Sequence, residues 1–147
     1  MKSQLIQLTK PPSPVFIETK PKAGRDLAYV SHANVSQLLL AAVGPYSWSK
    51  VPNSDLFDKE GNLEAAIWRL EITVDDKEIA IESVGDYDGM KGQTQGFRAQ
   101  VIESSSFRRA AAKAGCCLEL WVDGGHKTGA YVIHDYLSKP TENKEKE

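Results

Sequence analysis

Two adjacent arginines and a lysine lie among small side chains in the segment 104–115 (SSSFRRAAAKAG), and these cations are the residues best suited to chemistry. Arg108 and Arg109 can each offer a planar fork of N–H donors to a phosphate group, and Lys113 adds a point charge. Ser104 contributes a hydroxyl group on the same segment. The pattern predicts the last turns of a helix that Gly115 ends.

Further basic and aromatic residues surround this segment in the sequence. A surface that binds single-stranded nucleic acid combines cations for the phosphates with aromatic rings on which bases stack. Trp48 on a neighbouring loop could also provide an aromatic ring for stacking. Most aromatic residues in a chain of this size belong to the core, however, and this is expected of Trp68 above all. The candidate phosphate-binding and base-stacking residues are Arg108, Arg109, Lys91, Arg98, Lys113, Ser104, Tyr46 and Tyr87.

The overall charge opposes a nucleic-acid partner, whereas its distribution favours one. The net charge is -2 and the isoelectric point about 5.9. Residues 55–88 hold eleven acidic and three basic residues, whereas residues 90–115 hold five basic residues and one acidic residue. This segregation predicts one electropositive and one electronegative surface. The alternative interpretation is that the charged segments are only solvated faces that bind no partner.

Other chemistries find little support in the sequence. The run Gly124-Gly125-His126-Lys127-Thr128 lacks the first glycine spacing of a phosphate-binding loop. Asp86 and Asp88 in the glycine-rich loop would repel a nucleotide phosphate. The serines at 104–106 have no base placed by a motif nearby, and the three histidines are scattered. We therefore expect no enzyme activity, no cofactor and no metal.

Cys116 and Cys117 are adjacent, and neighbouring cysteines rarely bridge without strain. We expect two small buried thiols at the end of a helix, with nothing that implies an oxidising compartment. No apolar stretch approaches the length of a membrane span, and no signal-peptide pattern is present. These features predict an intracellular protein without a membrane partner.

At 147 residues the chain fits one domain. Four prolines among lysines predict an arm without regular helix, and a helix that Ser31 caps should end at Gly44 and Pro45. Trp68, Leu70, Ile72 and Val74 alternate with polar residues, as in a half-buried strand. We expect three parts: a basic proline-rich arm at 1–26, a domain at 27–137 and a charged disordered tail at 138–147. Within the domain, the expected elements are strands at 48–51, 67–74 and 78–84, loops at 55–62 and 85–96, a long helix at 97–114, a short strand or helix extension at 118–121 and an uncertain element at 131–137.

In this order and spacing, several segments resemble the Rad-fifty-two and Erf superfamily of single-strand annealing proteins. The resemblance covers roughly residues 27–121 and rests on the segments LAYVSH at 27–32, GPYSWS at 44–49, VGDY at 84–87 and SSSFRRAA at 104–111 with its closing glycine. It implies an α+β fold in which an antiparallel β-sheet packs against a long helix as a β-β-β-α core, assembled into an oligomeric ring or filament. It also implies ATP-independent binding of single-stranded DNA and annealing of complementary strands in homologous recombination and repair.

The resemblance assigns the phosphate backbone to Arg108 and Arg109, a basic position before the long helix to Lys91, and a helix hydroxyl to Ser104. Three positions depart from the family pattern: Asn34 and Ala112 replace basic residues, and Ser105 replaces an acid. Fewer basic contacts imply weaker or more salt-sensitive binding, unless the arm lysines contribute. These arm lysines are Lys10, Lys20 and Lys22.

The expected partners are single-stranded DNA, further copies of the chain, and a phage exonuclease or host single-strand binding protein. Size and shape resemble a phage or prophage protein in the cytoplasm of a bacterial host, without the mediator-binding tail of eukaryotic members. Two alternatives stay open: a single-stranded DNA-binding protein that does not anneal, and an oligomeric scaffold whose arginines form salt bridges between subunits with the acidic residues of 55–88.

Overall fold

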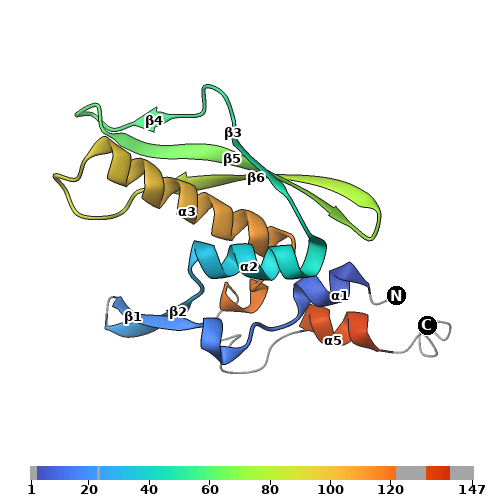
Figure 1. Cartoon of the computed structure of the whole chain (residues 1–147). Helices are drawn as coiled ribbons and strands as arrows, with labels where there is room; N and C mark the ends of the chain where they lie inside the picture. Colours follow the sequence, from blue (N-terminus) through green and yellow to red (C-terminus); the bar gives the residue numbers. More distant parts are fainter. Residues whose placement is uncertain (1–2, 23, 122–131, 140–147) are drawn as a thin grey trace.

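The computed structural model describes residues 3–22, 24–121 and 132–139 (Figure 1). The first third of the chain contains a short helix, a two-stranded hairpin and a second helix, and the rest contains a sheet, a long helix and a short helix near the carboxyl end. The elements are α1 (Gln4–Thr9), a 3-10 turn (Pro14–Phe16), β1 (Glu18–Lys22), β2 (Arg25–Tyr29), α2 (His32–Val43), β3 (Ser47–Lys50), β4 (Leu56–Phe57), β5 (Leu63–Val74), β6 (Lys77–Asp86), α3 (Gln95–Lys113), a 3-10 turn (Leu118–Leu120) and α5 (Val132–Ser138).

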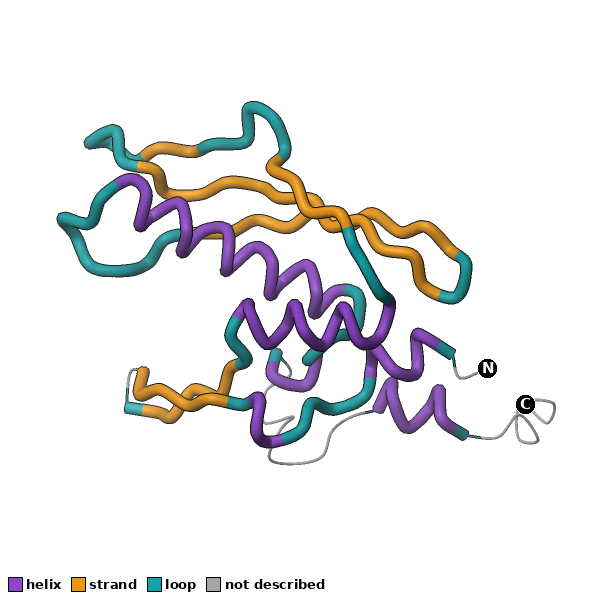
Figure 2. The backbone as a smooth tube through the Cα atoms, in the orientation of Figure 1, coloured by secondary structure: helices purple, strands orange, loops and turns teal. Residues whose placement is uncertain are grey.

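The main sheet is built around the long strand β5, and all of its pairings are antiparallel. β6 pairs with β5 along ten residue pairs, from Ala65↔Asp86 to Val74↔Lys77. On the other edge of β5, β3 pairs with residues 68–71 and β4 with residues 63–65. Helix α3 crosses one face of β5 and β6, and α2 lies against α3 (Figures 1 and 2). The predicted α+β class with an antiparallel sheet is confirmed.

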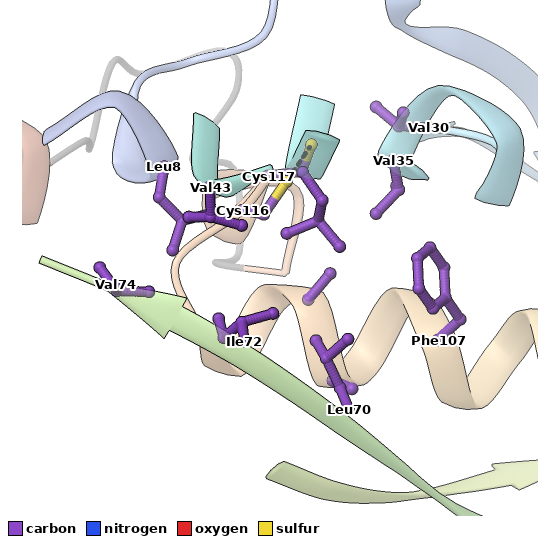
Figure 3. Packing of buried hydrophobic residues seen from close by; sticks show 13 residues of the cluster. Leu8, Val30, Val35, Val43, Leu70, Ile72, Val74, Phe107, Cys116 and Cys117 are labelled. Atoms are coloured by element: carbon purple, nitrogen blue, oxygen red, sulfur yellow. Dashed lines mark hydrogen bonds between the residues drawn. The ribbon is translucent and has the colours of Figure 1, made fainter. Parts of the chain in front are cut away.

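The core lies between the sheet and the helices (Figure 3). Leu70, Ile72 and Val74 of β5 are buried, whereas Glu71 and Thr73 between them are exposed, as the alternation predicts. These strand residues pack in one cluster with Leu39 of α2 and with Phe107, Ala110 and Ala111 of α3. Two alanines without exposed surface let the helix approach the strands closely, because their side chains end at Cβ.

A glycine in the sheet fixes how close α3 can lie. A Cβ atom at Gly85 of β6 would stand 2.8 Å from the Ile102 carbonyl carbon and 3.0 Å from the Ser106 Cβ atom. Ser106 is fully buried at this contact, and its hydroxyl donates a hydrogen bond of 2.6 Å to the Ser83 carbonyl oxygen. The glycine and the serine together set the position of α3 on the sheet.

The amino-terminal segment, which we expected to be an arm, forms a helix and a strand of a hairpin. Leu8 and Thr9 of α1 are buried, and α1 lies against α2 and α5. β1 and β2 form an antiparallel hairpin, in which Glu18 pairs with Tyr29 and Lys20 with Leu27. β2 therefore crosses the boundary that we expected between residues 26 and 27. Pro21 is tolerated because a two-stranded ribbon leaves one side of each strand without a backbone partner.

Most predicted boundaries hold to within a few residues. Ser31 caps α2 by accepting a hydrogen bond from the Asn34 N–H, and the helix ends at Gly44 with φ of 76°. α3 begins at Gln95 behind the cap residue Thr94, two residues before the expected start. β5 begins four residues before the expected start at 67, the expected loop at 55–62 contains the two residues of β4, and β6 extends to Asp86.

The last two uncertain segments are helical where described: 118–120 forms a 3-10 turn and 132–138 forms α5. The expected disordered tail overlaps α5 at Ser138, and its residues 140–147 lie outside the described part of the chain, as does the glycine-rich run at 124–128. Within the described residues, none of the helices has both the length and the apolar character that a membrane crossing requires.

Candidate nucleic-acid interface

The two adjacent arginines of α3 point to different neighbours, because successive helix residues are turned by about 100°. Arg109 faces the edge of β6, where its Nη1 lies 2.9 Å from Asp86 Oδ1 and donates a hydrogen bond of 3.0 Å to the Val84 carbonyl oxygen. One turn later, Lys113 Nζ donates a hydrogen bond of 3.2 Å to the Glu82 carbonyl oxygen. Both cations therefore hold α3 to the outer strand of the sheet.

Arg109 also bears on the scaffold interpretation. That interpretation expects salt bridges between subunits, with the acidic segment 55–88 as the source of partners. Asp86 does belong to this segment, but it pairs with Arg109 within one chain. A half-exposed ion pair of this kind is worth at most about 1 kcal/mol, so it positions the helix more than it stabilises the fold.

Arg108 faces the opposite side, toward β2 and α2. Its Nε donates a hydrogen bond of 3.3 Å to the Ser104 carbonyl oxygen, and no carboxylate of the described residues forms an ion pair with it. Partial burial lowers the pKa of the Arg108 guanidinium, and the charge of Arg109 acts in the same direction. An arginine nevertheless stays protonated, so Arg108 presents a partly desolvated positive charge that no carboxylate of the described residues pairs with directly.

Two neighbouring cavities meet at Arg108, and Tyr29 and Val101 line both of them. The first, of about 310 Å³, lies between the β1–β2 hairpin, α3 and the segment 116–121. We name it the basic groove, and its charged and aromatic lining consists of Lys20, Tyr29, Arg108, Arg109, Trp121, Asp86 and Asp88. The second, of about 560 Å³, lies between α2, β3 and α3. We name it the aromatic cavity, and its main lining consists of Tyr29, His32, Tyr46, Trp48, Phe97, Gln100, Glu103, Ser104, Phe107 and Arg108.

The hairpin contributes residues to the basic groove that the sequence analysis did not predict as site residues. The Lys20 ammonium lies 5.1 Å from the centre of the Tyr29 ring, in a cation–π arrangement. A hydrogen bond to Glu18 raises the pKa of the Tyr29 hydroxyl. Trp121, which is 52% exposed, adds a second ring to the groove. Sequence patterns gave Lys20 only as one of several arm lysines and offered no signal for Tyr29 or Trp121.

Three predicted residues lie at the other end of α3. Arg98 is only 7% exposed, its Nε donates a hydrogen bond of 2.7 Å to the Leu63 carbonyl oxygen, and its guanidinium lies 4.3 Å from the Tyr87 ring centre. Its Nη2 also lies 3.4 Å from Asp58 Oδ2. The Tyr87 hydroxyl donates to the Met90 carbonyl oxygen at 2.6 Å. These contacts hold the loop before α3 in place.

Lys91 is exposed in that loop. Neither Lys91 nor Arg98 nor Tyr87 lines either of the two cavities at Arg108, although Phe97 from the same end of α3 lines the aromatic cavity. Arg98 and Tyr87 are thus engaged in the fold, whereas Lys91 is a separate exposed charge.

Ser104 and Tyr46 do lie next to Arg108, in the aromatic cavity. The Ser104 hydroxyl is 3.3 Å from His32 Nδ1, and the Tyr46 hydroxyl is 2.6 Å from Ser36 Oγ. The Ser104–His32 pair is exposed, and among the described residues no carboxylate forms a hydrogen bond or an ion pair with His32, so the pair lacks the third member of a nucleophilic triad. The described residues also contain no group of three potential metal ligands.

The two cysteines line the basic groove, and Glu119 follows them in the chain. Cys116 and Cys117 are free and buried, with their sulfur atoms 3.9 Å apart, as expected for two thiols at the end of the helix. The hydrogen bond between them and their burial raise the pKa of the Cys117 thiol. Burial raises the pKa of the Glu119 carboxyl to about 7. The Cys117 thiol is therefore a poor nucleophile at neutral pH, because its thiolate form is disfavoured, whereas the Glu119 carboxyl is about half protonated there.

The chain matches no family model, and no curated protein is similar enough to it to qualify as a relative.

Proposed function

We propose that this protein binds single-stranded DNA along the basic groove and promotes annealing of complementary strands without ATP. The observation that carries the proposal is Arg108, a partly desolvated cation that forms no ion pair with the described residues and lines two cavities whose linings also hold aromatic rings. A sequence-independent single-strand site requires cations and a stacking surface next to each other. Apart from the two-residue strand β4 between β3 and β5, the chain order β3, β5, β6 and α3 also agrees with the β-β-β-α order that the family resemblance implies.

Annealing requires no bond to be made or broken. Two polyanions have to approach each other, so the protein must neutralise phosphates while the strands stay extended with most bases free to pair. Lys20 and Arg108 supply two cations to the groove, whereas the charge of Arg109 is balanced by Asp86. Each neutralised phosphate contributes about 0.7 to the slope of log affinity against log salt concentration for single strands. Two contacts per subunit give a slope near 1.4, which is too small for tight binding by one subunit.

Several subunits on one strand would overcome this weakness, because linked sites act at a high effective concentration. We therefore propose that the active form is a homo-oligomer, a ring or a filament that lines up successive basic grooves. In recombination and repair such an assembly acts on strands that a nuclease or a single-strand binding protein presents. Light scattering in the presence and absence of DNA tests the assembly directly, since a 16.2 kDa particle in both conditions would contradict it.

The variant Arg108→Ala tests the site. Arg108 makes no ion pair with a described residue and one hydrogen bond to its own helix, so its removal should leave the fold intact. The matched control is Arg69→Ala, which removes an exposed arginine that pairs with Glu71 and Glu82 of the same sheet. A charged hydrogen bond is worth about 1.5–3 kcal/mol, so we expect Arg108→Ala to weaken strand binding at least about tenfold and Arg69→Ala to leave it unchanged.

The assay is annealing of two complementary labelled oligonucleotides at low and moderate salt, together with direct binding of one strand. Acceleration that falls with salt and with Arg108→Ala supports the proposal. Binding without acceleration identifies a protective single-strand binder instead. If Arg108→Ala anneals like the wild type, the groove is not the site. The double variant of Arg108 and Arg109 is a poorer test, because the second arginine holds α3 to β6.

A further inference from the structure

The aromatic cavity beside the basic groove has the size and shape of a ligand site. Its volume of about 560 Å³ lies in the range of pockets that enclose small organic molecules. It shares Arg108 and Tyr29 with the basic groove, so a strand that lies in the groove passes its mouth. Resting on the proposed function, we propose that this cavity binds one unpaired base of the strand whose phosphate contacts Arg108, and that Glu103 makes it prefer a base with an exocyclic amino group.

The walls of the cavity are held in place before any ligand arrives. Trp48 is stacked on Trp68 with ring centres 5.4 Å apart, and it meets Phe107 edge-on at 5.0 Å. Tyr46 lies against Phe107 at 5.6 Å, and its hydroxyl is fixed by Ser36. Rings that are already ordered lose little conformational entropy on binding, so they form a suitable stacking surface for a base.

The charges around the cavity orient a nucleotide within it. Arg108 stands at the boundary with the groove, where a phosphate group would be stabilised. Glu103, five residues before Arg108 on α3, also lines the cavity, and its carboxylate would repel a phosphate group. A nucleotide can satisfy both residues only with its phosphate at Arg108 and its base inside the cavity.

Glu103 also supplies a means of discrimination between bases. Its Oε1 accepts a hydrogen bond of 3.2 Å from Trp48 Nε1, which fixes the carboxylate and leaves Oε2 as an acceptor. A carboxylate accepts from amino groups such as the N4 amino group of cytosine, whereas thymine has no amino group to offer. The Gln100 amide, one turn before Ser104 in the same lining, can donate or accept at the remaining base edge.

The experiment compares binding of single strands of equal length that carry only deoxycytidine, only thymidine, or only abasic sugars. One stacked base is worth about 1–3 kcal/mol, so we expect the abasic strand to bind at least about tenfold more weakly than the deoxycytidine strand. We expect the deoxycytidine strand to bind about fivefold or more tightly than the thymidine strand, because a base-specific hydrogen bond such as the one to Glu103 is worth about 1 kcal/mol or more. Glu103→Gln should abolish this preference, because an amide can also donate to the thymine carbonyl groups.

Glu78→Gln on β6 is the matched control, because it removes the same charge from an exposed strand position outside the cavity lining. It should keep the preference, and any gain in affinity from the lost negative charge should be the same for both strands. Equal binding of the abasic and deoxycytidine strands, with binding still sensitive to Arg108→Ala, would overturn the base site but leave the proposed function standing. A preference that survives Glu103→Gln would overturn the role of the carboxylate. Absence of binding to all three strands would overturn both proposals.

Discussion

Replacement of Gly85 by alanine should destabilise the protein strongly, because this glycine lets α3 lie on the sheet. The new Cβ atom would overlap the Ile102 carbonyl oxygen, which is the nearest atom, and would be 2.8 Å from the Ile102 carbonyl carbon and 3.0 Å from Ser106 Cβ. An ordinary contact of 3.4 Å to the carbonyl carbon alone requires α3 to retreat by 0.6 Å, and relief of the overlap with the oxygen requires a larger shift. That shift strains the 2.6 Å hydrogen bond from Ser106 to Ser83, which is buried. Overpacking costs about 1–3 kcal/mol and a weakened buried hydrogen bond about 1 kcal/mol, so we expect a loss of about 2–4 kcal/mol.

Urea unfolding followed by circular dichroism measures this loss. The dependence of the unfolding free energy on urea is about 1–3 kcal/mol per molar for small proteins, so at a slope of about 2 kcal/mol per molar the midpoint should fall by about 1–2 M. The matched control is Gly96→Ala in the first turn of α3, where a Cβ meets no atom within 4 Å. Alanine has the higher helix propensity, so this control should be neutral or stabilise the protein by up to about 1 kcal/mol. Equal midpoints for Gly85→Ala and the wild type would refute the close approach of α3 to β6.

Two further predictions concern pH. Burial raises the pKa of Glu119 to about 7 from an ordinary 4.5, so the folded state binds more protons than the unfolded state between these values and stability should fall as pH rises through this window. Glu119→Gln should remove that loss of stability, which is worth about 1–3 kcal/mol after allowance for solvent screening. Thermal unfolding of the wild type and the variant at pH 5 and pH 8 measures it. An equal loss of stability in both proteins between these two pH values would contradict the raised pKa of Glu119. The Asp75 carboxylate at the β5–β6 turn accepts hydrogen bonds from the Ser3 hydroxyl and the Gln4 N–H, each at 2.7 Å, and these bonds lower its pKa below the ordinary 3.8. The stability that this carboxylate contributes is therefore present above the ordinary pKa of 3.8 and lost as pH falls through the folded pKa. The α1 amides of Asp75→Asn should exchange faster than those of the wild type at neutral pH, and in acid the wild-type α1 amides should lose protection relative to their intrinsic exchange rates. Unchanged exchange in the variant would show that the turn does not hold the helix.

The local elements of this fold follow from local patterns. The alternation from Trp68 to Val74 determines a half-buried strand, because side chains on a strand point to opposite faces in turn. The cap at Ser31 and the stop at Gly44 determine α2 for reasons that lie within a few residues. The hairpin of β1 and β2 was not predicted, since Pro21 and the lysines around it are typical of an irregular arm. Its pairing partner, not its composition, makes β1 a strand.

For the candidate site, too, one part could be predicted from the sequence and another could not. Its chemistry could be predicted from residue types, since the predicted residues Arg108, Ser104 and Tyr46 line the aromatic cavity. Which cations are available could not be predicted. Arg98 looks as suitable in the sequence as Arg108, but it is buried between Asp58 and the Tyr87 ring because the β4 segment and the loop before α3 close over it.

The sequence by itself determined the amphipathic strands, the helix ends and the separation of positive and negative segments, because each depends on neighbours a few residues away. Only the tertiary structure decided that Arg109 pairs with Asp86 while Arg108 stands without an acid among the described residues, next to Lys20 and Tyr29 from a hairpin about 80 residues earlier in the chain. The physical reason is that adjacent residues on a helix face different neighbours, and those neighbours are chosen by packing between distant segments.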